Sequence, residues 1–407
     1  MGIDFSQEFV QKARENHPNC TFINADAHDF KLDEEFDYII LSDMINDAED
    51  VQKLFLNLRH VCKPGTRIII NYYSHLWEQL LTLAERLGLK TPALEQNWLT
   101  TGDLKNLFYL ADFDVIRVWQ EILWPIRFPL LSGIANRYLV KLWPFSYFAL
   151  TNFMTARPMP LKKGESAKNQ TVTVVVPARN EAGNIEGIFD RIPEMGEWTE
   201  IVFVEGNSRD NTYEVIQTAI NTHPERKAKV FRQSGKGKAD AVRLGFKKAS
   251  GDILMILDAD MTVAPEDLPK FYDCLTSGKA EFVNGVRLVY PMEKQAMRFV
   301  NLMGNKFFSL AFSWLLGQTI KDSLCGTKVL GKSHYEKIAA NRRYFGDFDP
   351  FGDFDLLFGA AKLSMKIVDL PVRYRNRTYG TTQISRLTHG FLLIRMMLFA
   401  MRRIKFV

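Results

Sequence analysis

The sequence has little cysteine and no paired cysteine motif. Its 407 residues include four widely separated cysteines: Cys20, Cys62, Cys274 and Cys325. Because a disulfide framework or a structural zinc site needs cysteines at short, regular spacings, neither is supported. The pattern predicts a reducing, cytoplasmic compartment.

Long apolar runs are also missing. The sequence opens without a recognisable signal peptide, and no uninterrupted apolar stretch reaches the length of a membrane span. The stretch 122–153 is apolar and aromatic, but prolines and basic residues interrupt it, namely Pro125, Arg127, Pro129, Arg137, Lys141 and Pro144. We expect this stretch to be interfacial or partly buried rather than membrane-spanning.

The charge is only mildly unbalanced. The formal net charge is +5, which fits an ordinary solvated surface or an attraction to anionic lipid or nucleotide phosphate. Basic residues gather in the tail 388–407: Arg395, Arg402, Arg403 and Lys405. This tail predicts an amphipathic basic helix that lies on the cytoplasmic face of a membrane, and no nucleic-acid partner is predicted.

The chain divides into two α/β halves. Residues 158–170 are rich in proline, lysine and small residues, which is typical of a linker. Before and after them, apolar strands alternate with helical patterns. We therefore predict one domain over 1–157, the linker over 158–170, a second domain over 171–387 and the tail.

The first half contains a series of short strands that end in acidic or polar turns. One ends at Asp4, a second precedes Asp26, a third covers 36–41, and a turn at 63–67 leads into a fourth over 68–71. This succession resembles class I S-adenosylmethionine-dependent methyltransferases from their second strand onward, over roughly 1–118. The resemblance implies that Asp4 binds the ribose hydroxyls and that Asp26 meets the adenine.

One departure from that family is large. Its first strand and glycine-rich loop, which contact the methionine part of the cofactor, have no counterpart before Asp4. Since that strand is central in such sheets, we expect an incomplete Rossmann-like sheet and a vestigial S-adenosylmethionine site. S-adenosylmethionine is expected as a cofactor only if a missing N-terminal segment exists, and a packing or scaffolding role is favoured over methylation.

The second half contains two carboxylates, Asp258 and Asp260, that close the apolar run 252–257. Such a run predicts a buried strand, and open α/β folds bind their ligands at the carboxyl ends of strands. Acidic side chains at i and i+2 leave the strand end on the same side. The pair therefore predicts a site for Mg²⁺ or Mn²⁺ that faces a diphosphate.

Three further motifs precede the acidic pair. The strand 171–176 leads into Pro177-Ala-Arg-Asn-Glu181, and the strand 200–204 leads into the acidic turn that begins at Glu205. Residues 234–241 form a glycine- and lysine-rich loop at the start of a helix. Such loops suit anions, because backbone amides and lysines point at one place, although many are only solvated turns.

In this order, the motifs resemble the family 2 glycosyltransferases, whose fold is the GT-A nucleotide-diphosphosugar transferase fold. The resemblance runs from about Thr171 to the C-terminus. It implies that the nucleotide sugar is bound by Pro177, Arg179, Glu181, Glu205, Lys236, Asp240 and Asp258. It also implies that Asp258 and Asp260 hold the metal at the donor diphosphate, that Asp260 is catalytic, and that the anomeric carbon is inverted.

The order of the segments after Asn284 looks like the dolichyl- or polyprenyl-phosphate sugar synthases within this family. By that resemblance, Arg287, Arg298 and Lys328 hold the lipid phosphate. The apolar helical pattern over 297–316 is either an ordinary core helix or a helix that faces a membrane. Arg373, Arg375 and Arg377 are either a basic lid over the diphosphate or, for the first two, a solvated strand.

The acidic and aromatic segment 348–355 opens another helix. Asp353 and Asp355 are either partners of the helix dipole or candidates for the general base of an inverting transferase with a hydroxyl acceptor. A phosphate acceptor is already anionic and needs no such base.

The sequence therefore predicts a metal-dependent inverting glycosyltransferase at the cytoplasmic membrane face. Its predicted partners are a nucleotide-diphosphate sugar and a polyisoprenyl phosphate. Transfer to a hydroxyl of a glycan or small molecule is the enzymatic alternative. A longer chain could also be a bifunctional methyltransferase and glycosyltransferase, and a binding module without activity is the non-enzymatic interpretation.

Overall fold

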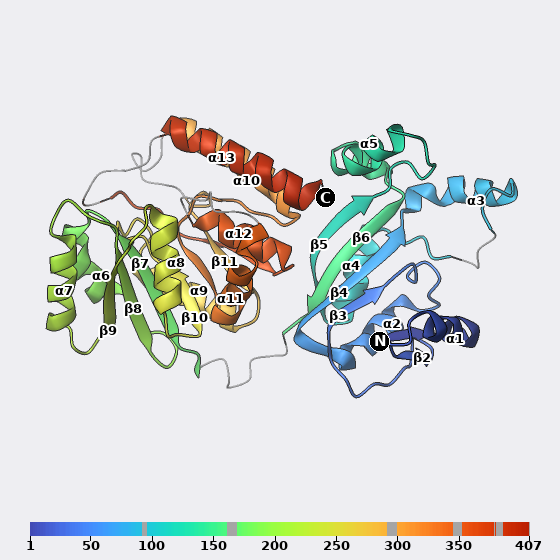
Figure 1. Ribbon diagram of the computed structural model, residues 1–407, viewed down its shortest axis with the longest axis horizontal. Coiled ribbons are helices and arrows are strands. Elements are labelled where there is room, and N and C mark those ends of the chain that lie inside the picture. The colour runs from blue at the N-terminus through green and yellow to red at the C-terminus, as the bar shows by residue number, and fades with distance from the viewer. Residues whose placement is uncertain are drawn as a thin grey trace. The chain divides into compact units, whose positions relative to one another are not determined.

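The computed structural model describes residues 1–91, 96–160, 169–290, 299–344, 352–377, 379 and 386–406. The chain separates into two compact units, unit 1 (Met1–Met159) and unit 2 (Pro160–Val407). Both units are α/β, as the sequence predicts (Figure 1). None of the described helices is long and apolar enough to cross a membrane.

Unit 1 has two separate sheets among its described residues. β1 (Gly2–Asp4) pairs in parallel with β2 (Phe22–Asn24). The larger sheet has the order β3-β4-β6-β5 and is formed by β3 (Phe36–Leu41), β4 (Cys62–Tyr73), β5 (Phe113–Glu121) and β6 (Thr151–Pro158). Among the described residues, β1 and β2 therefore form a sheet separate from the one that begins at β3.

The helices of unit 1 are α1 (Gln7–Asn16), α2 (Val51–Leu58), α3 (Glu78–Arg86), α4 (Thr101–Leu110) and α5 (Leu131–Arg137). α2 and α4 carry the core. Leu54, Phe55 and Phe108 are fully buried, and the rings of Phe55 and Phe108 stack with centroids 4.0 Å apart. Neither α3 nor α5 buries any residue.

Among the described residues of unit 2, one sheet has the strand order β13-β11-β12-β10-β7-β8-β9. The strands are β7 (Val172–Ala178), β8 (Thr199–Glu205), β9 (Lys227–Arg232), β10 (Ile253–Ile256), β11 (Phe282–Val286), β12 (Lys328–Gly331) and β13 (Ile367–Pro371). β10, β7, β8 and β9 run parallel, whereas β12 is antiparallel to both of its neighbours. The carboxyl ends of β7, β8 and β10 therefore share one edge.

Helices cover both faces of this sheet. They are α6 (Ile185–Arg191), α7 (Thr212–Thr222), α8 (Lys238–Lys248), α9 (Leu268–Thr276), α10 (Phe299–Leu316), α11 (Lys332–Ala340), α12 (Asp353–Lys362) and α13 (Arg386–Ala400). Successive β7 residues alternate between two cores, because side chains in a strand point to opposite faces. Val174 packs with α6, α7 and α9, and Val175 packs with α8, α10 and α12.

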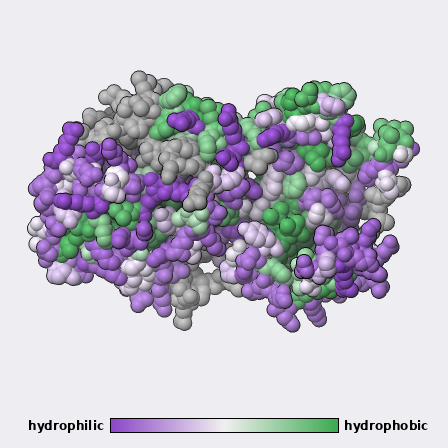
Figure 2. Space-filling model, in the orientation of Figure 1, coloured by the Kyte–Doolittle hydropathy of each residue, from purple (hydrophilic) through white to green (hydrophobic). Residues whose placement is uncertain are grey.

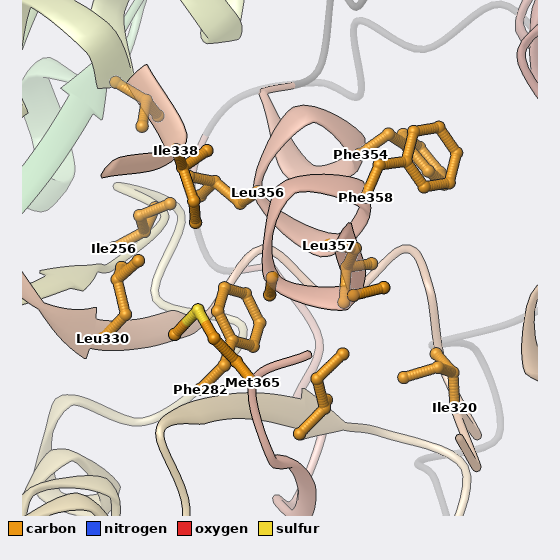
Figure 3. Packing of buried hydrophobic residues seen from close by; sticks show 14 of the residues in the cluster. Ile256, Phe282, Ile320, Leu330, Ile338, Phe354, Leu356, Leu357, Phe358 and Met365 are labelled. Carbon is orange, nitrogen blue, oxygen red and sulfur yellow. The ribbon is translucent and has the colours of Figure 1, made fainter. Parts of the chain in front are cut away.

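The second of these cores is rich in aromatic side chains. Phe354 and Phe358 of α12 pack against Phe312 of α10, with ring centroids 5.1 and 5.8 Å apart. The same core contains Ile338 of α11 and Phe282 and Leu330 of the sheet (Figure 3). This packing fixes α12 on the sheet and so fixes the position of Asp353 at its first turn.

The C-terminal helix begins at Arg386 rather than at residue 388 and is followed by one π-helical turn over Met401–Lys405. Its inner side packs into the core through Leu393, Met396 and Ala400. Its outer side is apolar too, since it exposes Phe391, Ile394 and Leu398. The prediction of an amphipathic helix is therefore corrected: α13 is apolar on two faces, and its basic residues gather mainly at its end.

Candidate functional site

Asp258 and Asp260 follow β10 directly, at the edge where β7 and β8 also end. The backbone N–H of Leu257 still donates to the Val175 carbonyl at 3.0 Å, so the ladder with β7 lasts until the residue before Asp258. The sequence prediction placed the pair at this edge, and the structure agrees.

Each of the two acids is held by a basic residue from another element. Nζ of Lys238, at the start of α8, lies 2.5 Å from Oδ1 of Asp258. Nη2 of Arg377, beyond β13, lies 2.5 Å from Oδ2 of Asp260. The Asp260 Oδ1 atom accepts from the backbone N–H and the hydroxyl of Thr262, at 3.1 and 2.8 Å. Acids and bases thus alternate across the site.

Burial is the largest single influence on Asp258 and would raise its pKa, but the charge and hydrogen bond of Lys238, together with two more distant basic residues, outweigh burial and hold the pKa below its usual range. Lys328 and Arg287 act in the same direction. For Lys238, burial favours the neutral amine, yet Asp258, Asp353 and Asp260 together raise its pKa. The Asp258 carboxylate and the Lys238 ammonium are therefore both charged at neutral pH.

Lys238 is the residue that the sequence prediction missed. The prediction chose Lys236 from the Lys-Gly-Lys loop, but Lys236 is exposed, and Lys238 reaches the carboxylate. Asp240, also predicted, accepts the backbone N–H of Gly235 at 3.1 Å and so closes the loop on itself. The α8 helix begins at Lys238, and this start explains which of the two lysines faces the sheet edge.

The turns after β7 and β8 hold each other through side chains. The backbone N–H of Asn180 donates to the Ser208 hydroxyl at 3.0 Å, and the side-chain Oδ1 of Asn180 accepts from the backbone N–H of Arg209 at 2.8 Å. Glu205 is buried and accepts from the backbone N–H of Ser208 at 2.5 Å. Pro177 is paired with Val204 in the ladder, and Arg179 follows the strand with an exposed side chain.

Glu181 has an unusual environment for a carboxylate. Burial raises its pKa to about 7, and Asp260 adds to the rise, whereas Asn184 and Arg377 oppose it. The Asn184 side chain donates to Glu181 Oε2 at 2.7 Å. Near neutral pH this carboxyl group is therefore divided between its two protonation states.

This environment predicts a dependence of stability on pH. Because the pKa in the folded state is raised, the folded chain holds its proton where the unfolded chain has lost it. The contribution to stability falls as pH rises from about 4.5 to 7 and is level above that. We expect Glu181→Gln to remove this decline, about 3 kcal/mol, from the free energy of unfolding.

Urea unfolding of both proteins between pH 4 and pH 8 measures this difference, with the exposed Glu214→Gln as the matched control. Identical pH profiles for the parent protein and Glu181→Gln would contradict the assignment.

The two candidate acids of α12 point to different places. The charge of Asp353 reaches Lys238, so Asp353 belongs to the site. Asp355 instead lies 3.5 Å from Nη1 of Arg243 and 3.3 Å from Nε of Arg342. There it lines a cavity of about 480 Å³ between α8 and α11. The structure therefore separates two residues that the sequence offered as equivalents.

The residues predicted to hold the acceptor phosphate are mostly committed elsewhere. Arg287 donates from Nε and Nη2 to the two oxygens of buried Asp322, at 2.7 and 2.9 Å. Lys328 is fully buried and donates to the Cys325 carbonyl. The prediction that Lys328 holds a lipid phosphate is therefore wrong for direct contact, because its ammonium group is buried. Its charge instead lowers the pKa of Asp258. Arg298 lies outside the described residues.

The segment after β13 crosses the loop that carries Asp260. Tyr374 bridges to Val263, the backbone N–H of Arg375 donates to the Thr262 carbonyl at 2.9 Å, and Arg377 reaches Asp260. Beyond it, the ring of Tyr379 packs closely against Gly183. Arg377 thus lies against the acidic pair, and its role as a lid over a diphosphate stays a prediction. Arg373 and Arg375 instead face a second, smaller cavity beside Glu266.

Gly326 is a site residue that the sequence prediction did not single out. A Cβ atom at this position would overlap both the Asp258 carboxylate and the Lys238 ammonium. Only glycine lets the backbone pass this close to the ion pair.

We expect Gly326→Ala to displace the Asp258–Lys238 pair and to lower sugar transfer roughly 10- to 100-fold, because small misplacements of reacting groups are costly. Initial rates measure the effect. Gly304→Ala in α10 is the matched control, since a Cβ there meets open space. Unchanged transfer by Gly326→Ala would show that the close approach has no role.

In unit 1, the predicted S-adenosylmethionine residues lie at neighbouring strand ends. Asp4 ends β1 and accepts the backbone N–H of Ser6 at 2.8 Å. Asp26 follows β2 and is exposed. Hydrogen bonds from the backbone and ring of His28 lower its pKa. The two residues are close in the fold, but the larger sheet begins separately at β3.

Comparisons with known proteins agree with this division of the chain. Residues 173–339 match the family described as Glycosyl transferase family 2, and residues 1–117 match a family described as Methyltransferase domain. A dolichol-phosphate mannosyltransferase from Pyrococcus furiosus is 31% identical over 221 residues, which cover 52% of this chain and 59% of that protein. This chain thus spans about three fifths of that relative's length.

Two further similarities are more distant. A UDP-N-acetylglucosamine–dolichyl-phosphate N-acetylglucosaminyltransferase from Methanococcus voltae is 24% identical over 237 residues, which cover 55% of this chain and 93% of that protein. A crystal structure of glucosyl-3-phosphoglycerate synthase from Mycobacterium tuberculosis, in complex with Mn²⁺ and UDP, is also similar. The match covers 59% of this chain and 82% of the synthase chain. It is 19% identical with a TM-score of 0.45.

Proposed function

We propose that this chain, which carries a family 2 glycosyltransferase domain after a methyltransferase-like domain, transfers a sugar from a nucleotide-diphosphate donor to a polyisoprenyl phosphate. One observation carries the proposal. Asp258 and Asp260 stand at the carboxyl edge of the sheet, and each is paired with a basic residue, Lys238 or Arg377. This alternation of charge suits a diphosphate bound together with a divalent cation.

The acidic pair fits a hard metal ion. Asp258 and Asp260 offer only carboxylate oxygens, the ligands that Mg²⁺ and Mn²⁺ prefer, and the Asp258 side chain is about one third exposed. We assign these two residues as the metal ligands. A metal held there would neutralise the charge of the departing diphosphate.

The chain's own basic residues have the complementary task. Once their carboxylate partners engage a cation, Lys238 and Arg377 can donate to the oxygens of the diphosphate. Glu181 and Glu205 line the nucleotide side of the edge, next to the cross-linked turns after β7 and β8. Attack by the acceptor on the face opposite the leaving diphosphate inverts the anomeric carbon.

Two observations support a phosphate as the acceptor. Relatives named as dolichol-phosphate and dolichyl-phosphate sugar transferases match this half of the chain. Arg287, held by Asp322, is close enough for its charge to lower the pKa of Asp258. A phosphate acceptor is ionised at neutral pH and needs no general base.

A hydroxyl acceptor is the second candidate, because Asp353 lies at the site. A general base must lie within hydrogen-bonding reach of the proton that it removes. The charge of Asp353 also helps to raise the pKa of Lys238. Its position therefore fits a role in keeping the Lys238 ammonium charged as well as it fits a general base.

Two helices of unit 2, α10 and α13, expose apolar side chains to the exterior. α10 exposes Met303, Phe307 and Leu310, and α13 exposes Phe391, Ile394 and Leu398, each set spaced along one helix side. Figure 2 shows these helices as an apolar area. We infer that this face meets the membrane in which a polyisoprenyl phosphate resides, with Arg395 and Arg402 near the headgroups.

The test is a transfer assay with a panel of labelled nucleotide sugars, polyprenyl phosphate and Mg²⁺ or Mn²⁺. We expect label to enter the organic phase with at least one donor and to stay in water with EDTA. If no donor gives a lipid product while a soluble glycan becomes labelled, the acceptor assignment is wrong. If transfer persists in EDTA, the metal assignment is wrong.

A further inference from the structure

Unit 1 has an exposed aromatic segment that the proposed transfer reaction does not use. Residues 122–148 make up most of the connection between β5 and β6 and include α5. Leu130 and Trp143 are 83% and 80% exposed. Other exposed apolar side chains of the segment are Trp124, Ile126, Phe128, Leu131, Ile134, Tyr138, Leu142, Phe145, Tyr147 and Phe148. Most of the large apolar side chains in this stretch are thus exposed, and its predicted place at an interface stays a prediction.

The segment is held in place by hydrogen bonds. The Trp124 backbone N–H donates to Asn136 Oδ1 at 2.8 Å, and Asn136 Nδ2 donates to the Trp124 carbonyl at 2.9 Å. Val140 is fully buried, and the backbone N–H of Leu150 donates to the Ile122 carbonyl at 2.7 Å. The aromatic side chains therefore project outward from a fixed backbone.

A second apolar element lies next to this segment. α3 buries no residue, yet Leu80 and Leu83 of the helix and Leu87, just past its end, are exposed at the i, i+3, i+7 spacing of one helix side. Glu78 and Glu85 fall on the opposite side of the helix. Nε1 of Trp77, just before α3, donates to the Phe148 carbonyl at 2.9 Å and ties the two elements together. We call residues 122–148 and the leucine side of α3 the docking surface.

Its charge distinguishes between possible partners. Residues 122–150 contain no Asp or Glu, while Arg127 and Arg137 are exposed among the aromatic side chains. A second copy of this surface would bring the same arginines to the contact without an acid to meet them. Anionic headgroups supply the opposite charge, and Trp and Tyr favour the boundary between water and lipid.

We propose that the docking surface binds unit 1 to the interface of an anionic lipid bilayer (Figure 2). Leucine and aromatic side chains enter the headgroup region, and Arg127 and Arg137 meet lipid phosphates. The methyltransferase-like unit then acts as a membrane-binding module. This inference does not depend on sugar transfer, because every residue of the docking surface belongs to unit 1.

The experiment is sedimentation of the full chain with vesicles of phosphatidylcholine and phosphatidylglycerol in equal parts, at limiting lipid. We expect Leu80→Glu/Leu83→Glu to lower the partition coefficient at least about tenfold. Tyr109→Glu/Leu110→Glu is the matched control. Tyr109 and Leu110 are 65% and 49% exposed, and Leu80 and Leu83 are 55% and 52% exposed, so the two pairs are matched in exposure. Tyr109 and Leu110 are the last residues of α4 and precede β5, whereas residues 122–148 of the docking surface follow β5.

A second variant, Arg127→Glu/Arg137→Glu, keeps the apolar side chains. It should bind the mixed vesicles more weakly than the parent protein does and should bind pure phosphatidylcholine about as the parent does. Equal vesicle binding by the parent and both docking-surface variants would overturn the proposal, and so would an equal loss in the control.

A dimer that forms without lipid and is lost in Leu80→Glu/Leu83→Glu would overturn it in favour of a second copy. Transfer to a short, water-soluble polyprenyl phosphate should be unchanged in these variants, so failure of the proposed reaction would be seen separately.

Discussion

Asp260→Asn should lower sugar transfer roughly a thousandfold while leaving the fold intact, because it removes one of two carboxylates that face the donor diphosphate. The substitution is nearly isosteric, and its Oδ1 atom can still accept from Thr262. What is lost is the charge that pairs with Arg377 and that would ligate a divalent ion. Initial rates at saturating donor, with Mn²⁺ titrated, measure the effect.

The matched control is Asp273→Asn, which changes an exposed acid on α9. It should transfer sugar at the parent rate, and both variants should show the parent's circular dichroism. If Asp260→Asn retained a tenth or more of the parent rate at every Mn²⁺ concentration, Asp260 could not be a catalytic ligand.

Asp322→Ala should destabilise unit 2 by about 3–5 kcal/mol, the usual cost of leaving a buried charge without its partner. Asp322 is fully buried and accepts from the Arg287 guanidinium, from Asn305 and from the backbone N–H of Leu324. Its removal leaves the Arg287 guanidinium, which is largely buried, without a counter-charge. Urea unfolding monitored by fluorescence measures the change.

A double variant separates the lost ion pair from the lost packing. Arg287→Met/Asp322→Leu removes both charges, and we expect it to be more stable than Asp322→Ala alone. If the double variant were the less stable of the two, an uncompensated guanidinium would not be the cause.

The same pair predicts the response to acid. Burial would raise the pKa of Asp322, but Arg287 lowers it to about 2. Because this pKa is depressed in the folded state, the stabilisation is present above about pH 4 and is lost as pH falls toward 2.

The sequence was sufficient to place the acidic edge of unit 2. Apolar runs bounded by polar turns marked β7, β8 and β10, and parallel strands necessarily bring their carboxyl ends to one edge. The position of Asp258 and Asp260 follows from that rule alone.

Side-chain partners were not accessible in the same way. Lys236 and Lys238 are alike in sequence, and only the start of α8 decides which one reaches Asp258. Asp353 and Asp355 both open α12, yet two positions along a helix turn a side chain through more than half a circle. Asp355 therefore meets Arg243 and Arg342 instead of the site.

Long-range pairs explain the remaining differences. Arg287 and Asp322 are 35 residues apart, and nothing in either local sequence indicates that they bind each other. The close approach of Gly326 to the Asp258–Lys238 pair likewise brings together segments that are far apart in the sequence. The exposure of residues 122–148 depends on whether another element covers them, which composition cannot decide.

The most direct test of the central claim compares two acceptors that differ in one group. With a nucleotide sugar that supports transfer and saturating Mn²⁺, initial rates are measured for a polyprenyl phosphate and for the matching polyprenol. Transfer confined to the phosphate, with an inverted anomeric centre in the product, is the predicted result. Equal or faster transfer to the alcohol, or retention of the anomeric configuration, would contradict the account.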